Sequence, residues 1–434
     1  MAGIGATKIR QVILLCLLCA VASSTRAWGY SYLPEKKAAP QYRVSPLWSL
    51  QMQRDRFFKF QKSELATPVL EGSQLLVPSD SGFLYAVTKE TGKVQWIFKA
   101  AGRLHAAPLL DGPLLYIGDS KGLLYAVDRT SGKEVWRTHV GGEIVTTPSV
   151  ADDKIFVGDA ASRLVALKKS DGSFVWQGSV SRPQGGIIYY SGTPLALSGG
   201  NDASEDLASP VLARGLSGGR RASAPESFPL TIIGGTVDGH YFRSPLGGGT
   251  ADWVKPSDGK RGVVAEGIWD VKSIGDDVVI GTSHGSMCRV EAGAGKQKWC
   301  ATVGDGVQLA VNGEKIYAGN FSGEMRVIDL ITGAELWTVH GLEGPLTAPA
   351  PGENFVAVGA PKVGLLLVNP ESLSLGYRRY CKGGVAATPV AEGDRVYFVT
   401  GMGRITALKV SKIIKKTNPV LDGIRTRKSR LKSL

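Results

Sequence analysis

The sequence is poor in the residues that build catalytic and metal centres. It has only five Cys and five His among 434 residues. The histidines are scattered without the spacing of a metal site. No Cys-x-x-Cys-His haem motif, nucleophile elbow, P-loop or dinucleotide fingerprint occurs. We therefore expect a protein that is not an enzyme, with no catalytic residue, no metal site and no cofactor.

Charge is also modest, and long apolar runs are rare. Charged residues make up 21% of the chain, whereas glycine is abundant at 56 residues. Such a composition is typical of a turn-rich all-β protein. The hydrophobic content of 43% is too high for a disordered chain.

One apolar run, residues 12–22, lies behind Lys8 and Arg10 and ahead of Thr25-Arg26-Ala27. This order of positive, apolar and small residues predicts a signal peptide over 1–27 and export. An uncleaved membrane anchor is the alternative, although the run is shorter than the ~20 residues that span a bilayer. A lipoprotein is not expected, because leucines precede both cysteines of the run.

The net charge of +13 is concentrated at the C-terminus. Residues 411–434 hold eight Lys or Arg and one Asp, a balance of 8 − 1 = +7. Such a tail is usually solvated. Contact with an anionic surface of lipid, glycan or nucleic acid is the alternative.

A repeat dominates the rest of the chain. Gly82-Phe-Leu-Tyr-Ala-Val87 is followed by Thr91-Gly92 and Trp96, and Gly122-Leu-Leu-Tyr-Ala-Val127 by Ser131-Gly132 and Trp136. Copies begin at positions 82, 122, 162, 239, 285, 323, 364 and 403. Their spacing is nearly regular, except for one long interval between positions 162 and 239. Repeats of roughly 40 residues are typical of propeller blades, so these eight units predict an eight-bladed β-propeller of four-stranded antiparallel blades.

Each unit contains four expected strands. A short opening strand ends in a Thr-Pro or Ala-Pro step, the third strand is the Gly-x-Leu-Tyr-Ala-Val segment, and the fourth carries the Trp. Large apolar area between stacked blades comes from these tryptophans. The structural residues expected in this role are Trp48, Trp96, Trp136, Trp176, Trp299 and Trp337.

The ring is expected to close through its N-terminal strand. The last unit, at 403–408, has no Trp strand after it, and residues 45–50 supply one that contains Trp48. Closure of this kind removes a free sheet edge. The predicted organisation is therefore a linker over 28–44, a propeller over 45–410 and a basic tail over 411–434.

The long interval between positions 162 and 239 holds an insertion. Residues 178–229 are rich in Gly, Ser, Ala and Pro and interrupt the strand pattern in blade 4. A loop of this length is usually functional or disordered. We therefore consider both a partner-binding loop and a segment without a role.

Cys288 and Cys300 flank a turn on the third and fourth strands of one blade. In an exported protein a disulfide between them is plausible, and closing so short a loop would stabilise the fold by up to ~3 kcal/mol. Two buried thiols are the alternative.

The Ala-x-Asp-x-x-Thr-Gly-x-x-x-Trp type of repeat, as in Ala126 to Trp136, resembles the PQQ-type propeller repeat. That repeat occurs in quinoprotein dehydrogenases and in BamB, the accessory propeller of bacterial outer-membrane protein assembly. The resemblance covers roughly residues 45–410. Quinoprotein dehydrogenases hold their quinone against two adjacent cysteines, which this chain lacks, so the resemblance favours a BamB-like scaffold.

The resemblance also suggests a partner. The run Arg220-Arg-Ala-Ser-Ala-Pro225 is similar to the exposed BamB loop that contacts the barrel-assembling protein BamA together with acidic residues of the next blade. It implies that Arg220 and Arg221 bind a BamA-like protein, with Glu266 and Asp270 as the acidic side. We expect a monomer that binds no nucleic acid. The other functions considered are an exported propeller that binds another envelope partner or a glycan, and a PQQ-dependent dehydrogenase.

Overall fold

The computed structural model describes residues 41–52, 66–144, 146–159, 163–179, 196–198, 231–235, 241–245, 252–254, 268–274, 277–282, 284–291 and 296–413. They belong to one compact unit that begins at Gln41. The predicted signal peptide and almost all of the predicted basic tail lie outside these residues. No helix that is long and apolar enough to cross a membrane occurs among them.

The described chain is built of strands. The first sixteen are β1 (Tyr42–Gln51), β2 (Val69–Glu71), β3 (Gln74–Pro78), β4 (Phe83–Thr88), β5 (Val94–Lys99), β6 (Leu109–Asp111), β7 (Leu114–Gly118), β8 (Leu123–Asp128), β9 (Glu134–His139), β10 (Ser149–Ala151), β11 (Lys154–Gly158), β12 (Arg163–Lys168), β13 (Phe174–Ser179), β14 (Ala196–Ser198), β15 (Thr231–Gly235) and β16 (Tyr241–Pro245). The others are β17 (Asp252–Val254), β18 (Ile268–Ile274), β19 (Asp277–Thr282), β20 (Ser286–Glu291), β21 (Gln297–Thr302), β22 (Gln308–Asn312), β23 (Lys315–Gly319), β24 (Met325–Asp329), β25 (Glu335–Val339), β26 (Ala350–Pro351), β27 (Val356–Ala360), β28 (Gly364–Asn369), β29 (Ser374–Tyr380), β30 (Val390–Glu392), β31 (Arg395–Thr400) and β32 (Arg404–Lys412).

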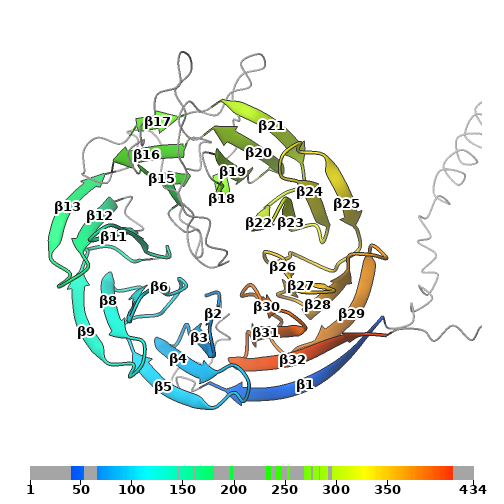
Figure 1. Ribbon diagram of the computed structural model, residues 1–434, viewed down its shortest axis with the longest axis horizontal. Helices are drawn as coiled ribbons and strands as arrows, with labels where there is room; N and C mark the ends of the chain where they lie inside the picture. The colour runs from blue at the N-terminus through cyan, green and yellow to red at the C-terminus, as the bar shows by residue number, and fades with distance from the viewer. Residues whose placement is uncertain are drawn as a thin grey trace, which may run out of the picture. The chain divides into compact units, whose positions relative to one another are not determined.

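These strands form four-stranded antiparallel sheets arranged as the blades of a propeller (Figure 1). In chain order the sheets within the described residues are β2–β5, β6–β9, β10–β13, β14–β17, β18–β21, β22–β25, β26–β29 and β30–β32 with β1. Side chains are described in seven of them, whereas β14–β17 is defined by its backbone pairing alone. The prediction of an all-β propeller with four-stranded antiparallel blades is confirmed.

The ring closes through the N-terminal strand. β1 pairs antiparallel with β32 from Tyr42 opposite Lys412 to Gln51 opposite Arg404, and the two strands lie side by side in Figure 1. β1 begins three residues before the predicted boundary at 45, because Tyr42 is buried against Phe355 and its hydroxyl donates a hydrogen bond to the Asn354 carbonyl at 2.6 Å. β32 likewise continues to Lys412, beyond the predicted end at 410.

The predicted insertion at 178–229 also needs a correction. β13 continues to Ser179, and β14, the first strand of the fourth sheet, lies at Ala196–Ser198 inside the range assigned to the insertion. β14 pairs with β15 across the second part of that range. Residues 180–195 and 199–230 lie outside the described residues.

In the sheets whose side chains are described, the second and third strands are mostly apolar on both faces, because neighbouring sheets cover both. Between the first two sheets, Leu76 and Leu84 pack in one cluster with Leu115 and Ile117, and each is at most 1% exposed. Burial of one such side chain stabilises the fold by roughly 1.5–3 kcal/mol. In the sequence these strands therefore appear as continuous apolar runs and not as alternating apolar and polar residues.

The Thr-Pro and Ala-Pro steps lie just before the first strand of a sheet, not at its end as expected. Pro68 precedes β2, Pro108 precedes β6, and Pro148 precedes β10. A proline has no N–H to give to a β-ladder, so it is tolerated where pairing has not yet started.

Trp48, Trp96, Trp136 and Trp299 join consecutive sheets. Trp96 of β5 donates its indole N–H to the Arg129 carbonyl at 2.8 Å, in the turn between β8 and β9 of the next sheet. Its ring lies on Gly132 of the same turn, which has a φ of +69° and where a Cβ would come within 2.5 Å of the ring. The same pair of contacts joins Trp48 to the turn at Lys89 and Gly92.

Ion pairs repeat this connection. Arg129, whose carbonyl accepts the Trp96 indole, also pairs with Glu71 of the preceding sheet at 3.0 Å. The equivalent Lys89 pairs with Glu392 at 2.7 Å, and Lys169 pairs with Asp111. The residue that accepts the indole hydrogen bond in the last turn of a sheet therefore joins this sheet to the preceding one through both its carbonyl and its side chain.

Candidate partner-binding face

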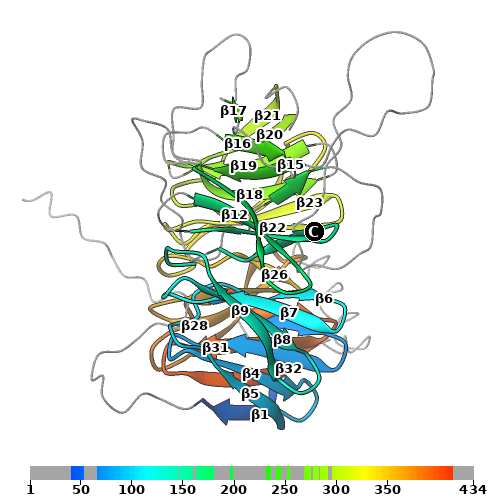
Figure 2. The ribbon, with the colours of Figure 1, turned by 90° about the vertical axis from the view of Figure 1, so that its left-hand side faces the viewer.

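The strands run across the thickness of the ring, so the turns gather on its two faces (Figure 2). In an antiparallel sheet of four strands, the second turn and the connection to the next sheet lie at the same end. We call the face that carries them the inter-blade face, and the opposite one the hairpin face. Loops supported by rigid strands are where binding residues usually lie.

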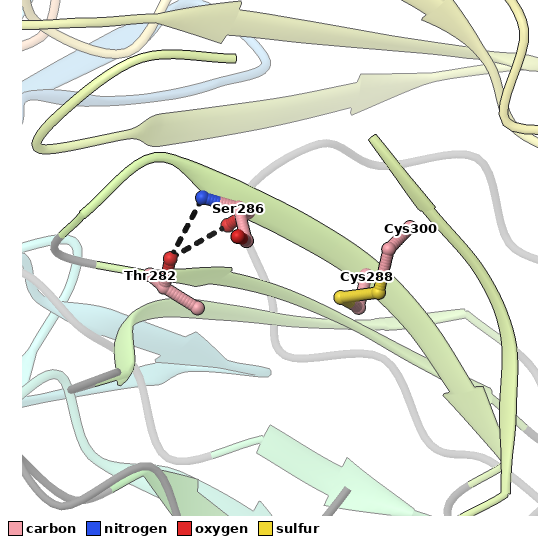
Figure 3. Close-up of a disulfide and its surroundings, with 4 residues drawn as sticks. All are labelled: Thr282, Ser286, Cys288 and Cys300. Carbon is pink, nitrogen blue, oxygen red and sulfur yellow. Dashed lines mark hydrogen bonds between the residues drawn. A yellow bond between two sulfur atoms is a disulfide. The ribbon is translucent and has the colours of Figure 1, made fainter. Parts of the chain in front are cut away.

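The loops of the inter-blade face are held by one polar residue that ends the second strand or directly follows it. The carboxylate or amide oxygen of this residue, or its hydroxyl, accepts a hydrogen bond from the backbone N–H four residues later, at 2.8–3.2 Å. Its occurrences are Asp119, Asp159, Thr282, Asn320 and Thr400. Figure 3 shows Thr282, whose hydroxyl also donates to the Ser286 carbonyl at 3.0 Å.

Two of these residues also tie the preceding connection to the face. Asp119 accepts hydrogen bonds from the Gly102 N–H at 2.7 Å and the Tyr125 hydroxyl at 2.9 Å. Asp159, whose side chain is fully buried, accepts from the Gly142 N–H at 3.1 Å and pairs with Arg163 at 2.6 Å. Buried charges whose hydrogen bonds are satisfied rigidify a loop. The connections between the first three sheets are therefore held in fixed positions.

A histidine between two carboxylates lies on the same face. His105, in the connection between β5 and β6, contacts Asp80 through Nε2 at 2.8 Å and Glu143 through Nδ1 at 3.0 Å. Asp80 lies in the second turn of the first sheet, and Glu143 in the connection between β9 and β10. The cluster therefore joins loops of three consecutive sheets.

The environment of His105 favours its charged form. The hydrogen bond with Asp80, helped by the charges of Asp80 and Glu143, raises the pKa of His105 above its ordinary value, against the opposing effect of burial. Within the described residues, no group of three or more His, Cys, Asp or Glu has the arrangement of a metal site. The cluster is thus an ion-paired junction of loops.

His105 makes stability depend on pH. Its pKa is higher in the folded than in the unfolded state, so its contribution is complete below the ordinary value near 6.5 and is lost as pH rises through the raised folded value. His105→Ala should lower the free energy of unfolding by about 1–2 kcal/mol at pH 6 and by less at pH 9. Urea unfolding at both values measures the difference, and His139→Ala, at an exposed position of β9, is the control. An equal loss for His105→Ala at the two pH values would contradict the assignment.

A groove lies elsewhere on the inter-blade face. It has a volume of about 400 Å³ and is lined by loops of the β22–β25 and β26–β29 sheets and by the connection to β30, among them Phe321, Pro345 and Pro361. Its walls are mainly apolar. A second hollow of about 500 Å³ lies on the hairpin face beside Asp111 and Lys169, and their ion pair bridges it.

The residues predicted to bind a partner are only partly described. Arg220, Arg221 and Glu266 lie outside the described residues. Asp270 of β18 is 7% exposed, accepts a hydrogen bond from the Leu309 N–H at 2.9 Å and pairs with Lys272 at 3.1 Å. Its carboxylate holds β18 against β22.

The structure contains the predicted disulfide. Cys288 of β20 and Cys300 of β21 are directly opposite each other, with their Cα atoms 4.1 Å apart (Figure 3). Among the described residues Cys381 is the free cysteine, and burial raises the pKa of its thiol. A thiol held in its neutral form is a poor nucleophile.

No sequence pattern predicts the cluster of His105, Asp80 and Glu143, because the three residues come from three loops with no common motif. The polar residue after the second strand did leave a signal. It follows a glycine at or next to the end of the second strand, since Asp119, Asp159, Thr282 and Asn320 come after Gly118, Gly158, Gly281 and Gly319. An alignment of the repeats on these glycines identifies the position.

Comparison with known families now adds to this geometry. The family described as outer membrane protein assembly factor BamB matches residues 45–198 and 322–413, which together are more than half of the chain. The chain belongs to this family. The match includes most of the sheets in the first and the last part of the chain. It confirms the resemblance to a BamB-like propeller of PQQ repeats.

Individual relatives are distant. The outer membrane protein assembly factor BamB of Alkalilimnicola ehrlichii is 24% identical over 129 residues, which are 29% of this chain and 34% of that protein. The chain thus aligns with about a third of the length of this relative. The crystal structure of BamB from Moraxella catarrhalis superposes with a TM-score of 0.63 at 16% identity and covers 85% of this chain and 100% of that one.

A quinohemoprotein alcohol dehydrogenase from Pseudomonas putida HK5 has a similar fold. Its TM-score is 0.58 at 11% identity, over 86% of this chain and 77% of that one. At this identity the likeness concerns the propeller architecture only, since one fold hosts many functions.

Proposed function

We propose that this protein is an exported, non-catalytic scaffold that supports the assembly of outer-membrane β-barrel proteins through protein–protein contacts. Its membership in the BamB family is the observation that carries the proposal. In this proposal the propeller lies in the periplasm or at the periplasmic face of the outer membrane. The partner is a barrel-assembly component similar to BamA.

The build of the inter-blade face supports this proposal. Buried carboxylates, amides and hydroxyls hold the loops of this face in place through hydrogen bonds. The cluster of Asp80, His105 and Glu143 joins three of these loops. Loops that are already ordered lose little conformational entropy on binding. A rigid, loop-lined face of this kind suits a scaffold that holds a partner.

Arg220 and Arg221 are the residues proposed to contact the partner, with Glu266 as the acidic residue nearby. An arginine guanidinium binds carboxylates with two parallel hydrogen bonds, which makes it effective at protein interfaces. The basic residues after position 413 are proposed to approach an anionic surface, with a salt-dependent contribution to binding.

The test is affinity purification from the envelope of the source organism, with mass spectrometry of what is recovered. The wild-type chain should recover a barrel-assembly component, and the double variant Arg220→Glu with Arg221→Glu should recover at least ~10-fold less. The matched control reverses two exposed charges in turns of the hairpin face, Lys133→Glu with Lys296→Glu, and should bind as wild type does. Failure of the wild-type chain to recover any such component would overturn the proposal.

A further inference from the structure

The groove on the inter-blade face is lined mainly by apolar side chains from several loops. Phe321 comes from the second turn of the β22–β25 sheet, and Pro345 and Leu346 from the connection that follows it. Pro361 lies in the second turn of the next sheet, and Ala386 in the connection to β30. At about 400 Å³, the groove is within the size range of ligand pockets.

The walls of the groove are held in place. The N–H of Leu346 donates to the Asn320 carbonyl at 3.0 Å, and that of Thr347 to the Gly359 carbonyl at 2.9 Å. The N–H of Val385 donates to the Ala360 carbonyl at 3.2 Å. Leu346 is only 1% exposed and forms the floor, whereas Phe321 is 41% exposed at the rim. An occupant would therefore meet a preformed apolar surface.

One polar side chain faces the groove with donors to offer. Gln308 lines it, and its Oε1 accepts a hydrogen bond from the Ala348 N–H at 2.8 Å. A backbone N–H can bond only to an acceptor, so this contact fixes which end of the amide is the oxygen. The NH₂ group has no partner among the described residues, and it can donate to a peptide carbonyl.

Charged side chains near the groove determine which kind of peptide segment it favours. Lys362 follows Pro361, and its Cδ lies 4.0 Å from where a Cβ on Gly344 would be. Lys382 lies four residues before Ala386 in the same connection. Both are exposed and form no ion pair with the part of the chain that the structure describes.

The acidic groups nearby leave this cationic side intact. Glu343 is paired with Arg378 at 2.6 Å. Asp305 lies next to the wall of the groove that Phe321 forms, since its carbonyl accepts the Phe321 N–H. A carboxylate of an occupant is therefore attracted to the side of Lys362 and Lys382 and repelled from that of Asp305.

We propose that this groove binds an extended segment of a partner protein in which an apolar side chain is followed by Asp or Glu. The apolar side chain occupies the space above Leu346 beside Phe321, the acidic residues meet Lys362 and Lys382, and Gln308 donates to a backbone carbonyl. The chain's own basic segment at 412–432 is a poor occupant because the two lysines repel it. This site goes beyond the proposed function, since it does not depend on the residues or the partner of barrel assembly.

The experiment measures fluorescence anisotropy of the purified protein with labelled synthetic peptides. The probe has the sequence Ser-Gly-Pro-Leu-Glu-Glu-Gly-Ser, and two comparison peptides carry Lys-Lys in place of Glu-Glu or Gly in place of Leu. We expect the probe to bind at least ~10-fold more tightly than either comparison peptide. Phe321→Ala should weaken its binding ~10-fold, and Lys362→Glu with Lys382→Glu should weaken it ~10-fold and reduce its salt dependence.

Lys133→Glu, on the hairpin face, is the control and should bind as wild type does. Hydrogen exchange should show slower exchange at 345–348 and 384–387 when the probe is bound.

Equal binding of the three peptides, or unchanged binding by Phe321→Ala in a variant that melts as wild type does, would overturn the proposal. The proposal would also be overturned if the groove held a second copy of the chain, which would appear as a dimer that Phe321→Ala dissociates. These outcomes leave the affinity purification with Arg220 and Arg221 unaffected, so each proposal can fail alone.

Discussion

A chain that begins at residue 53 is expected to unfold at a lower temperature and to aggregate more readily than a chain that begins at residue 41. The shorter chain lacks β1, which pairs with β32 along its whole length and places Trp48 against Tyr397 and the turn at Lys89. Trp48 is half-buried, so its own share of the loss lies below the about 3–5 kcal/mol that truncation of a fully buried aromatic side chain costs. The exposed edge of β32 then offers a template for pairing with other chains. Thermal denaturation should show a midpoint about 10 °C or more lower.

A synthetic peptide of residues 41–52 should restore the shorter chain, because it can add the missing strand. The same peptide with Trp48→Ala should restore much less. In the intact chain, Trp48→Ala should be clearly destabilising, and Leu47→Ala, at a position that is 39% exposed on the same strand, is the matched control. If the chain that begins at residue 53 melts at the same temperature as the longer one, β1 does not close the ring.

The Gly132→Ala variant is expected to be destabilised by about 3 kcal/mol or more, because two separate costs add. The residue has a φ of +69°, a conformation that costs an alanine roughly 1–2 kcal/mol. Its new Cβ would also lie 2.5 Å from the Trp96 ring. The ring must then move away from the turn, and its hydrogen bond to the Arg129 carbonyl at 2.8 Å is lost. Chemical denaturation monitored by tryptophan fluorescence measures the change.

Gly112 separates the two causes. It lies in the same sheet with a φ of +55°, but a Cβ there meets no atom within 4 Å. Gly112→Ala should therefore show only the backbone term of roughly 1–2 kcal/mol. Equal losses in the two variants would mean that the contact between Trp96 and Gly132 contributes little to the stability of the ring.

The repeat predicted the architecture because each unit carries the same local rules. A strand that is apolar on both faces, a turn glycine and a tryptophan at a fixed distance from the start of the copy recur down the chain. The closing role of Trp48 was also visible, since the last unit lacks the strand that the first segment supplies. The opposed positions of Cys288 and Cys300 followed from their places on either side of one hairpin turn.

The extent of individual elements was less accessible. β14 lies inside the range assigned to an insertion, because three strand residues between long Gly- and Ser-rich segments give too short a pattern. Tyr42 was placed in a linker, although its ring packs on Phe355, which comes from a distant part of the sequence. Asp270 was expected at a binding surface, but its carboxylate bonds to the Leu309 N–H of the next sheet.

The strand order within a blade thus follows from the pattern of a single repeat, and ring closure follows from the strand that the last repeat lacks and the first segment supplies. No sequence pattern reveals the junction of Asp80, His105 and Glu143 or the groove between Phe321 and Ala386. Both consist of side chains from several separate loops, and only the circular stacking of the sheets brings these loops together. The sequence therefore predicts the propeller, whereas the surfaces it offers to partners depend on distances across blades that no repeat encodes.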